Sequence, residues 1–457
     1  MTPRDEILSW YRTAALKLIN SPSPTSTDAE YIAVNQLLQR QATSLLRIHD
    51  AKDTSTHTIN QDLLKRRLDD ITSISTSKFY AYRYDLLPSH WREIHTDALI
   101  LTTFHEILTS LTSNTWLEEH VLDHIVELLD RAVITAGGAG ILGTKWIEQT
   151  LQLLERLSPT DEPDEPPAKK AKLHTEFSSE EPYGRPVLSP QRSCPIHKAW
   201  SLTTFERYMN SHPPRPIIFT DLVATWPALT DHPWKSPEYL LSQTFNGRRL
   251  IPVEIGRSYV DPNWGQELIP FKDFLSRYIT PSKTTGYLAQ HDLFTQIPSL
   301  RGDISTPDLC WSSVPLHPTD KSKNKEKVDV PRVNAWFGPA RTITPLHTDA
   351  YHNLLVQVVG TKYVRLYPPW SDMRPRGVED GVDMSNTSAL DVGVLEGWDE
   401  GEEGMSEGER ESLRAELEGE EYWECILGER DTLLIPMGWW HYVRSLSVSF
   451  SVSFWWN

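Results

Sequence analysis

Three residues in the last quarter of the chain have the types and spacing of a metal site. His347 and Asp349 form an H-x-D triplet, and His441 follows a separate apolar run through a Pro-Met-Gly turn. On a strand, residues two apart share a face, so His347 and Asp349 can hold one ion together. Two histidines and one carboxylate leave coordination positions open, which suits Fe(II) with a co-substrate and dioxygen better than a closed structural zinc. The alternative is that His441 is an ordinary half-buried strand histidine.

The triplet carries little weight without its context. With 16 histidines in 457 residues, about one H-x-D triplet is expected by chance. A second copy, His95-Thr96-Asp97, lies within a helical pattern, where we expect surface positions on a helix. The copy at His347 differs because strand-like residues precede it and a predicted β-hairpin, running from Asn353 through a Gly360-Thr361 turn, follows it.

Lys362 suggests a second component of the site. Alternate residues of a strand share a face, so Lys362 heads an apolar row that continues with Val364 and Leu366. A lysine that faces a barrel interior needs an anion, because an unpaired buried charge is costly. The distal carboxylate of 2-oxoglutarate is one candidate partner, and an internal aspartate or glutamate is the other.

The final apolar run also has two distinct faces. One face is apolar from Val448 to Phe454, and the alternate positions are serines from Ser447 to Ser453. A face of small hydroxyls can line a polar ligand cavity, although serines on a solvent-facing surface are the ordinary alternative.

The elements that must position these residues fall into two classes. Before residue 158 the apolar residues follow a helical period, as in Leu101, Phe104, Leu108 and Leu111, in Leu122, Ile125, Leu129 and Val133, and in Ile147, Leu151, Leu154 and Leu157. After residue 196 the pattern changes to short runs bounded by turn residues, at 216–219, 250–255, 353–359, 363–367, 432–435 and 448–454. We therefore expect an α+β multidomain protein, with an all-helical module over residues 1–158 and a β-rich domain over residues 197–457.

Residues 159–196 read as a disordered linker, because they are rich in proline and charge and carry few apolar residues. Within them, PPAKKAKL presents Lys169, Lys170 and Lys172 in a basic tract typical of a nuclear localisation signal. A merely solvated run of charge is the alternative. We expect a nuclear protein, with the cytoplasm as a further location.

Composition excludes several classes of protein. No stretch approaches 18 consecutive apolar residues and the first ten residues carry charges, so we expect neither membrane insertion nor export. The three cysteines, far apart and odd in number, favour free thiols over disulfides. Twelve acids and two arginines between residues 396 and 421 supply −10 of the net charge of −17. The acidity is therefore local, and no direct binding to nucleic acid is expected.

Two segments carry a family resemblance. NAWFGPARTITPLHTDAYHNLLVQVVGTKYVRLYPP and DTLLIPMGWWHYVRSLSVSFSVSFWW resemble Jumonji-C (JmjC) domain oxygenases, closest to the type of lysine demethylase 8, which is also described as an arginyl hydroxylase. RPIIFTDLVATWPAL, IPVEIG, GYLAQHDLFTQIP and DISTPDLC extend the resemblance over residues 197–457. It implies a cupin-like double-stranded β-helix with flanking helices and an Fe(II)- and 2-oxoglutarate-dependent dioxygenase.

The resemblance also implies roles for matching positions. The catalytic iron ligands would be His347, Asp349 and His441. The residues around 2-oxoglutarate would be Tyr287, Thr344, Asn353 and Lys362, with Trp336 and Trp455 as walls of the pocket. The substrate side would use Glu254, Tyr259, Trp264 and Gln290, each of which could equally be structural. A carboxylate beside aromatic rings suits a planar guanidinium.

Three functions remain open after the resemblance. The leading interpretation is hydroxylation of an arginine carbon in a protein or peptide, and the alternative is demethylation of Nε-methyl-lysine, with chromatin-associated partners. The third is a non-catalytic module that binds partners. The acidic stretch at about residues 396–421 departs from the family as an insertion. We expect it to be a mostly disordered surface loop, so that deleting residues 397–419 leaves iron binding intact.

Overall fold

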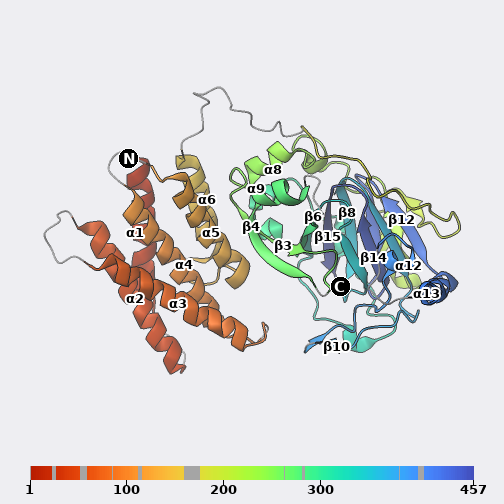
Figure 1. Cartoon of the computed structure of the whole chain (residues 1–457), viewed down its shortest axis with the longest axis horizontal. Coiled ribbons are helices and arrows are strands. Elements are labelled where there is room, and N and C mark those ends of the chain that lie inside the picture. The colour runs from red at the N-terminus through yellow and green to blue at the C-terminus, as the bar shows by residue number, and fades with distance from the viewer. Residues whose placement is uncertain are drawn as a thin grey trace. The chain divides into compact units, whose positions relative to one another are not determined.

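The computed structural model describes residues 2–22, 27–51, 59–84, 86–111, 116–158, 175–261, 263–279, 284–379, 381–399 and 406–457. The chain divides into two compact units, one made of residues 1–170 with 248–250 and the other of residues 171–247 with 251–457. Helices make up the first unit and sheets dominate the second (Figure 1). The predicted α+β class, with a helical region before a β-rich domain, is confirmed.

The first unit contains six helices within the described residues. They are α1 (Pro3–Ile19), α2 (Ala29–Asp50), α3 (Gln61–Ala81), α4 (Ser89–Ser110), α5 (Glu119–Ala136) and α6 (Gly143–Leu157). Local sequence sets their ends: Thr2 forms a capping box at the start of α1, and Gly137 ends α5 with φ +68°. The apolar faces point inward, with Phe104, Ile125 and Leu154 fully buried. None of the described helices combines the length and apolarity needed to cross a membrane.

The second H-x-D triplet is not on the surface, and that expectation was wrong. His95 and Asp97 are 6% and 8% exposed, because α4 packs against α2, α3 and α5 and is covered on most sides. The His95 ring lies 3.0 Å from the Ser75 hydroxyl and 3.3 Å from that of Thr135. Burial lowers the pKa of His95 to about 4. The triplet is therefore part of the core of the helical unit.

The second unit is built on two sheets. Within the described residues, the larger sheet has the order β1-β2-β13-β8-β15-β6-β5-β3-β4 and the smaller has the order β12-β9-β14-β7. The larger sheet comprises β1 (Ile196–His197), β2 (Ile217–Phe219), β3 (Leu250–Ile255), β4 (Gly265–Pro270), β5 (Gly286–His291), β6 (Arg332–Gly338), β8 (His352–Val359), β13 (Thr432–Ile435) and β15 (Ser449–Trp456). The smaller comprises β7 (Ile343–His347), β9 (Lys362–Tyr367), β12 (Trp423–Leu427) and β14 (Trp440–Ser445), and a separate pair is formed by β10 (Val378–Glu379) and β11 (Val382–Asp383).

Helices cover the outer faces of both sheets. They are α7 (Leu202–Ser211), α8 (Pro237–Gln243), α9 (Phe271–Phe274), α10 (Leu293–Gln296), α11 (Pro298–Arg301), α12 (Val392–Leu395) and α13 (Glu407–Gly419). Residues of α7 to α11 pack on the larger sheet, and residues of α12 and α13 pack on the smaller one. A third apolar cluster, which includes Leu355 of β8 and Val364 of β9, draws on strands of both sheets. The alternation along each strand therefore decides which side chains face the space between the sheets.

The predicted hairpin from Asn353 through Gly360-Thr361 is wrong in its pairing. Strand β8 pairs with β13 and β15, whereas β9 pairs with β12 and β14, so the turn passes from one sheet to the other. Gly360 makes this crossing with φ +69°, and a Cβ placed there would lie 1.9 Å from the Val448 carbonyl oxygen. Both strands are buried along their whole length, so each requires neighbours on both edges.

The serines of the last strand face inward and are fully buried. Ser449 and Ser451 hydrogen-bond to the Gln357 side chain, at 2.9 and 2.7 Å, and Ser453 accepts a hydrogen bond from Trp336 at 2.9 Å. In the part of the chain that the structure describes, these serines line none of the three cavities discussed below. These serines provide hydrogen-bond partners for the buried polar groups of Gln357 and Trp336.

Two segments that were expected to be disordered are ordered in part. Residues 175–196, the second half of the predicted linker, lie on the second unit: Phe177 packs on Phe337 at 5.4 Å, and the Ser189 amide donates to Glu424 at 2.7 Å. The basic tract and the rest of residues 159–174 lie outside the described residues.

The acidic stretch also differs from its predicted loop. Residues 407–419 form helix α13, which Ser406 caps and which buries Leu417. The Asp399 carboxylate is completely buried and lies 2.6 Å from the Arg444 guanidinium. The charges misled the prediction because the acids of this helix are all exposed, while Leu417 is buried and Leu413 packs on the same apolar cluster.

Candidate active site

The three predicted metal ligands converge between two neighbouring strands. His347 ends β7 and pairs with His441 of β14, and Asp349 lies two residues beyond the end of β7. The Asp349 carboxylate oxygens lie 3.8 Å from Nε2 of His347 and 3.6 Å from Nε2 of His441. Among the described residues, these three form the one cluster of histidine, cysteine and acidic side chains with metal-binding geometry.

Both histidines are held in the tautomer that a metal requires. Nδ1 of His347 lies 2.8 Å from the Pro345 carbonyl oxygen, and Nδ1 of His441 lies 3.0 Å from that of Trp439. Each Nδ1 therefore donates its proton to the backbone, which leaves the Nε2 lone pair directed at Asp349. Burial lowers the pKa of His441 and raises that of Asp349. Without a cation, the site consequently disfavours charge on each of these two groups.

Lys362 is buried beside the cluster with no acidic partner within the described residues. Its side chain is almost completely inaccessible, and its ammonium group donates to the Tyr287 hydroxyl at 3.1 Å. Burial lowers the pKa of Lys362 to about 7. The Asn353 side-chain oxygen and the Trp455 indole nitrogen are likewise buried without a hydrogen-bond partner. A polar ligand bound here would supply the hydrogen-bond and charge partners that these groups lack.

A groove of about 770 Å³ opens on the metal cluster. Its lining includes His347 and Asp349, the cofactor candidates Tyr287, Thr344, Trp336 and Trp455, and the substrate candidates Glu254, Tyr259 and Gln290. A small chamber behind it adds Asn353, Lys362 and His441. The structure therefore brings together the predicted ligand and cofactor residues around one space.

The substrate candidates are arranged around a buried carboxylate. Burial raises the pKa of Glu254, and a hydrogen bond with Trp264 opposes the shift. Tyr259 lies across the groove and its hydroxyl is 3.2 Å from that of Thr387. Trp264 contacts Glu254 but does not line the groove, so it differs from the other three candidates. Gln290 reaches the groove from β5 with φ +47°.

Two groups of groove residues were missed in the sequence. Residues 383–387 form one wall, and the Asn386 carbonyl oxygen accepts a hydrogen bond of 2.8 Å from the Thr348 amide, inside the H-x-D triplet. Asp320, Ser322, Lys323 and Lys325 form part of the rim. Both segments are irregular, so no hydrophobic period marks them in the sequence.

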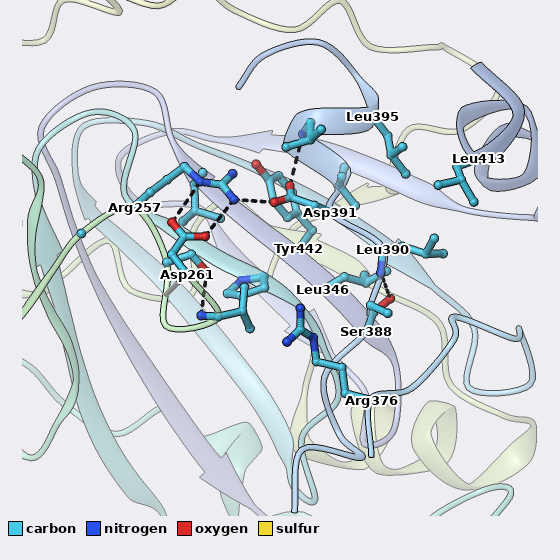
Figure 2. Close-up of a pocket in the computed structure, with 18 of the residues that line it drawn as sticks. Arg257, Asp261, Leu346, Arg376, Ser388, Leu390, Asp391, Leu395, Leu413 and Tyr442 are labelled. Atoms are coloured by element: carbon cyan, nitrogen blue, oxygen red, sulfur yellow. Dashed lines mark hydrogen bonds and ion pairs between the residues drawn. The ribbon is translucent and has the colours of Figure 1, made fainter. Parts of the chain in front are cut away.

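A second cavity, of about 490 Å³, is drawn in Figure 2. One side is charged, where Arg257 lies 3.2 Å from Asp261 and 2.5 Å from Asp391. The other side is apolar and includes Leu346 and Leu390. The cavity contains none of the three metal-ligand candidates, and its two arginines, Arg257 and Arg376, are already paired with carboxylates, so it does not compete with the groove as the reaction site.

Several known proteins are similar to this chain in sequence. The family described as cupin-like domain matches residues 201–457. Lysine-specific demethylase 8 of Danio rerio is 36% identical over 340 residues, which cover 72% of this chain and 75% of that protein. Lysine-specific demethylase JMJ30 of Arabidopsis thaliana is 41% identical over 250 residues, 54% of this chain and 50% of that protein. Jumonji C domain-containing protein 5 of Drosophila melanogaster is 36% identical over 273 residues, 59% of each chain.

The alignment spans 75% of the Danio protein but only 50% of the Arabidopsis protein and 59% of the Drosophila protein. The family match covers the whole β-rich domain and includes the His347, Asp349 and His441 cluster. On this evidence the chain belongs to the JmjC type of the cupin-like family and is a 2-oxoglutarate-dependent oxygenase.

Proposed function

We propose that this enzyme uses Fe(II) and 2-oxoglutarate to oxidise a basic side chain of a protein substrate, and that its reaction is demethylation of Nε-methyl-lysine. The observation that carries the proposal is the convergence of His347, Asp349 and His441 beside a buried Lys362. Two relatives bear the name lysine-specific demethylase, which favours demethylation over the arginine hydroxylation that the sequence suggested first.

The metal cluster fits Fe(II) by its donors. Two neutral imidazole nitrogens and one carboxylate form a face, and the remaining directions open to the groove. The backbone carbonyls that accept from each Nδ1 keep the ligands oriented. A divalent cation would also offset the cost of burying the Asp349 carboxylate.

The chamber behind the cluster fits 2-oxoglutarate by charge. The ammonium group of Lys362 and the hydroxyl of Tyr287 would bind the distal carboxylate, and Thr344 lies beside Tyr287. The buried Asn353 side chain would contact the end nearer the metal. Trp336 and Trp455 would cover the chamber and limit access of water, which protects reactive species from side reactions.

When bound, the metal and 2-oxoglutarate supply oxidative decarboxylation, which yields succinate and places one oxygen atom on a substrate carbon. The groove residues would hold that carbon near the metal. If the carbon is an N-methyl group, its hydroxylated product is a hemiaminal that loses formaldehyde. The protein's own contribution is therefore orientation, charge and exclusion of water.

A second candidate function is hydroxylation of an arginine carbon. The observation that favours it is Glu254, a largely buried carboxylate that reaches the groove beside Trp264 and Tyr259. A carboxylate can bind a guanidinium through two parallel hydrogen bonds, and nearby rings can stack on its plane. Glu254 and Tyr259, which both line the groove, could also hold a methylated ammonium ion, so the two reactions share one groove.

The test is mass spectrometry of purified protein with Fe(II), ascorbate and 2-oxoglutarate, incubated with methyl-lysine and arginine peptides. The proposal expects loss of methyl groups, with one formaldehyde and one succinate per event. Gain of one oxygen on arginine without formaldehyde would replace it with the second candidate. Absence of succinate under all conditions, despite bound iron, would favour a non-catalytic module.

A further inference from the structure

The rim of the groove carries a lysine-rich segment that the proposed reaction does not explain. Residues 317–328, here called the lysine loop, contain lysines at positions 321, 323, 325 and 327. Lys323 and Lys325 line the groove that also contains Glu254 and the metal cluster. In a chain with a net charge of −17, four alternating lysines, two of which line the groove, are an unexpected concentration of positive charge.

The lysine loop is held in place by its own side chains. The His317 amide donates to the Asn324 side chain at 2.9 Å, and the Asp320 amide donates to the His317 ring at 3.0 Å. At the other end, Asn457 donates to the Lys325 carbonyl at 3.1 Å and accepts from the Val328 amide at 3.0 Å. Asn457 follows β15, whose Trp455 lines the groove. These bonds fix the backbone that presents the lysines, which lowers the entropy cost of using them in binding.

The nearby carboxylates do not pair with these lysines. Asp320 accepts hydrogen bonds from the Ser322 amide and hydroxyl, at 2.9 and 2.6 Å, and Asp383 accepts from the Ser385 amide at 3.0 Å. Within the described residues, no lysine of the loop forms an ion pair within 4 Å. Lys323 interacts electrostatically with Asp320 and Asp383, which also line the groove, but without a close ion pair its ammonium group and that of Lys325 can turn to a ligand that enters the groove.

We propose that Lys323 and Lys325 select protein substrates in which aspartate or glutamate flanks the oxidised residue. The inference rests on the proposed function and adds a substrate class to it. The deep end of the groove offers the Glu254 carboxylate to a basic target residue, while the rim offers ammonium groups to the neighbouring residues. A peptide with a basic residue among acidic ones would match both ends.

The test compares peptides that share one target residue and differ only in their flanks, which are acidic, neutral or basic. KM is measured from succinate formation for the natural chain and for Lys323→Glu/Lys325→Glu. The matched control is Lys145→Glu/Lys198→Glu, which changes the net charge equally at two exposed lysines away from the groove. The natural chain and the control should favour the acidic peptide over the neutral one by about fivefold in KM at low salt, and the loop variant should lose or reverse this ratio.

A binding measurement separates this inference from the proposed reaction. Fluorescence anisotropy of the same labelled peptides is recorded with Mn(II) and 2-oxoglutarate in the absence of oxygen. If no peptide turns over but acidic peptides still bind through Lys323 and Lys325, the proposed reaction fails and the inference stands. Equal affinity for all flanks would overturn the inference. Displacement of the peptides by duplex DNA in the natural chain, but not in the loop variant, would also overturn it in favour of a nucleic-acid contact.

Discussion

His347 and Asp349 can share an ion because the chain leaves strand β7 between them and turns the carboxylate back toward the imidazole. His95 and Asp97 have the same spacing in helix α4, where two residues correspond to a rotation of about 200° and the side chains diverge. His95 instead hydrogen-bonds to hydroxyls of neighbouring helices. Backbone conformation thus decides which of two identical triplets can bind a metal.

Substitution at each triplet should have opposite consequences. His347→Ala removes a ligand, so bound iron and succinate formation should fall by about a thousandfold or more while thermal stability changes little. His95→Gln should leave iron content and turnover per folded molecule unchanged but lower the unfolding free energy by about 1 kcal/mol, because it disturbs a buried hydrogen bond. Metal analysis, succinate assay and thermal denaturation on both variants provide the comparison. Retained succinate formation by the His347 variant would contradict the assigned ligand set.

The depressed pKa of Lys362 predicts a pH dependence for co-substrate binding. Burial lowers the pKa of Lys362 to about 7, so the group is charged below pH 7 and loses its proton as the pH rises. Since a carboxylate binds the charged form, KM for 2-oxoglutarate should increase by up to about tenfold per pH unit above 7. Lys362→Met should raise KM by about 30-fold at pH 6.5 and remove the dependence. A pH profile of KM that is flat in the natural chain would show that Lys362 does not bind the co-substrate.

The residues that sequence could identify are those whose chemistry is unusual for their position. A lysine in an apolar row and an H-x-D triplet in a strand both conflict with ordinary core composition, so Lys362, His347 and Asp349 were found. Asn386 and Thr387 were not found, because polar residues in an irregular segment are unremarkable until the fold places them at the groove. The signal for such residues exists only in three dimensions.

At the scale of elements, the sequence predicted strands better than their partners. The runs at 353–359 and 363–367 match β8 and β9, but a short turn between two strands was taken to indicate a hairpin. The positive φ of Gly360 permits either a hairpin turn or a turn that crosses from one sheet to the other. Choosing between them requires knowing that both edges of each strand are occupied, which depends on β12 to β15 far along the chain.

The acidic stretch contains a buried ionic cluster. The Asp399 carboxylate lies 2.6 Å from Arg444 and 3.4 Å from each of Arg257 and Arg341. Arg444 belongs to β14, the strand that carries His441. Asp399 therefore connects the stretch between β9 and β12 to a strand of the metal site. Deleting residues 397–419, which is predicted to leave iron binding intact, would also remove Asp399 and with it this link to β14.

Asp399→Asn should destabilise the domain. It leaves buried guanidinium groups with less neutralising charge, which typically costs about 3–5 kcal/mol when one partner of a buried pair is removed. Glu409→Gln, at an exposed position of α13, should change the unfolding free energy by less than about 0.5 kcal/mol. Urea denaturation of both variants, with iron content measured alongside, tests the difference. Equal stability of the two variants would mean that Asp399 is dispensable and that the stretch is peripheral.

At the scale of the whole molecule, the two units present different kinds of evidence. The β-rich unit has a chemical site and relatives with named activities, whereas the helical unit has a well-formed core but no cluster of reactive groups that we can assign among its described residues. Helical periodicity predicts such a bundle well because packing alone produces it. The same periodicity carries no information about a partner, so the function of the helical unit does not follow from its fold.

The segment between the units carries the basic tract, and we propose that it directs the protein to the nucleus. Prolines at positions 163, 166 and 167 precede Lys169, Lys170 and Lys172, and because proline disfavours regular structure they would keep the charges accessible to an import receptor. A fluorescent reporter joined to residues 160–180 should therefore accumulate in nuclei.

The same reporter with Lys169, Lys170 and Lys172 changed to glutamine should lose that accumulation. Its length and proline content are unchanged, so the loss would be due to the lysines. The control replaces Glu165, Glu176 and Glu180 with glutamine and should remain nuclear. Equal distribution of all three reporters would show that the tract is only a solvated run of charge, and import would then have to depend on another part of the chain or on a partner.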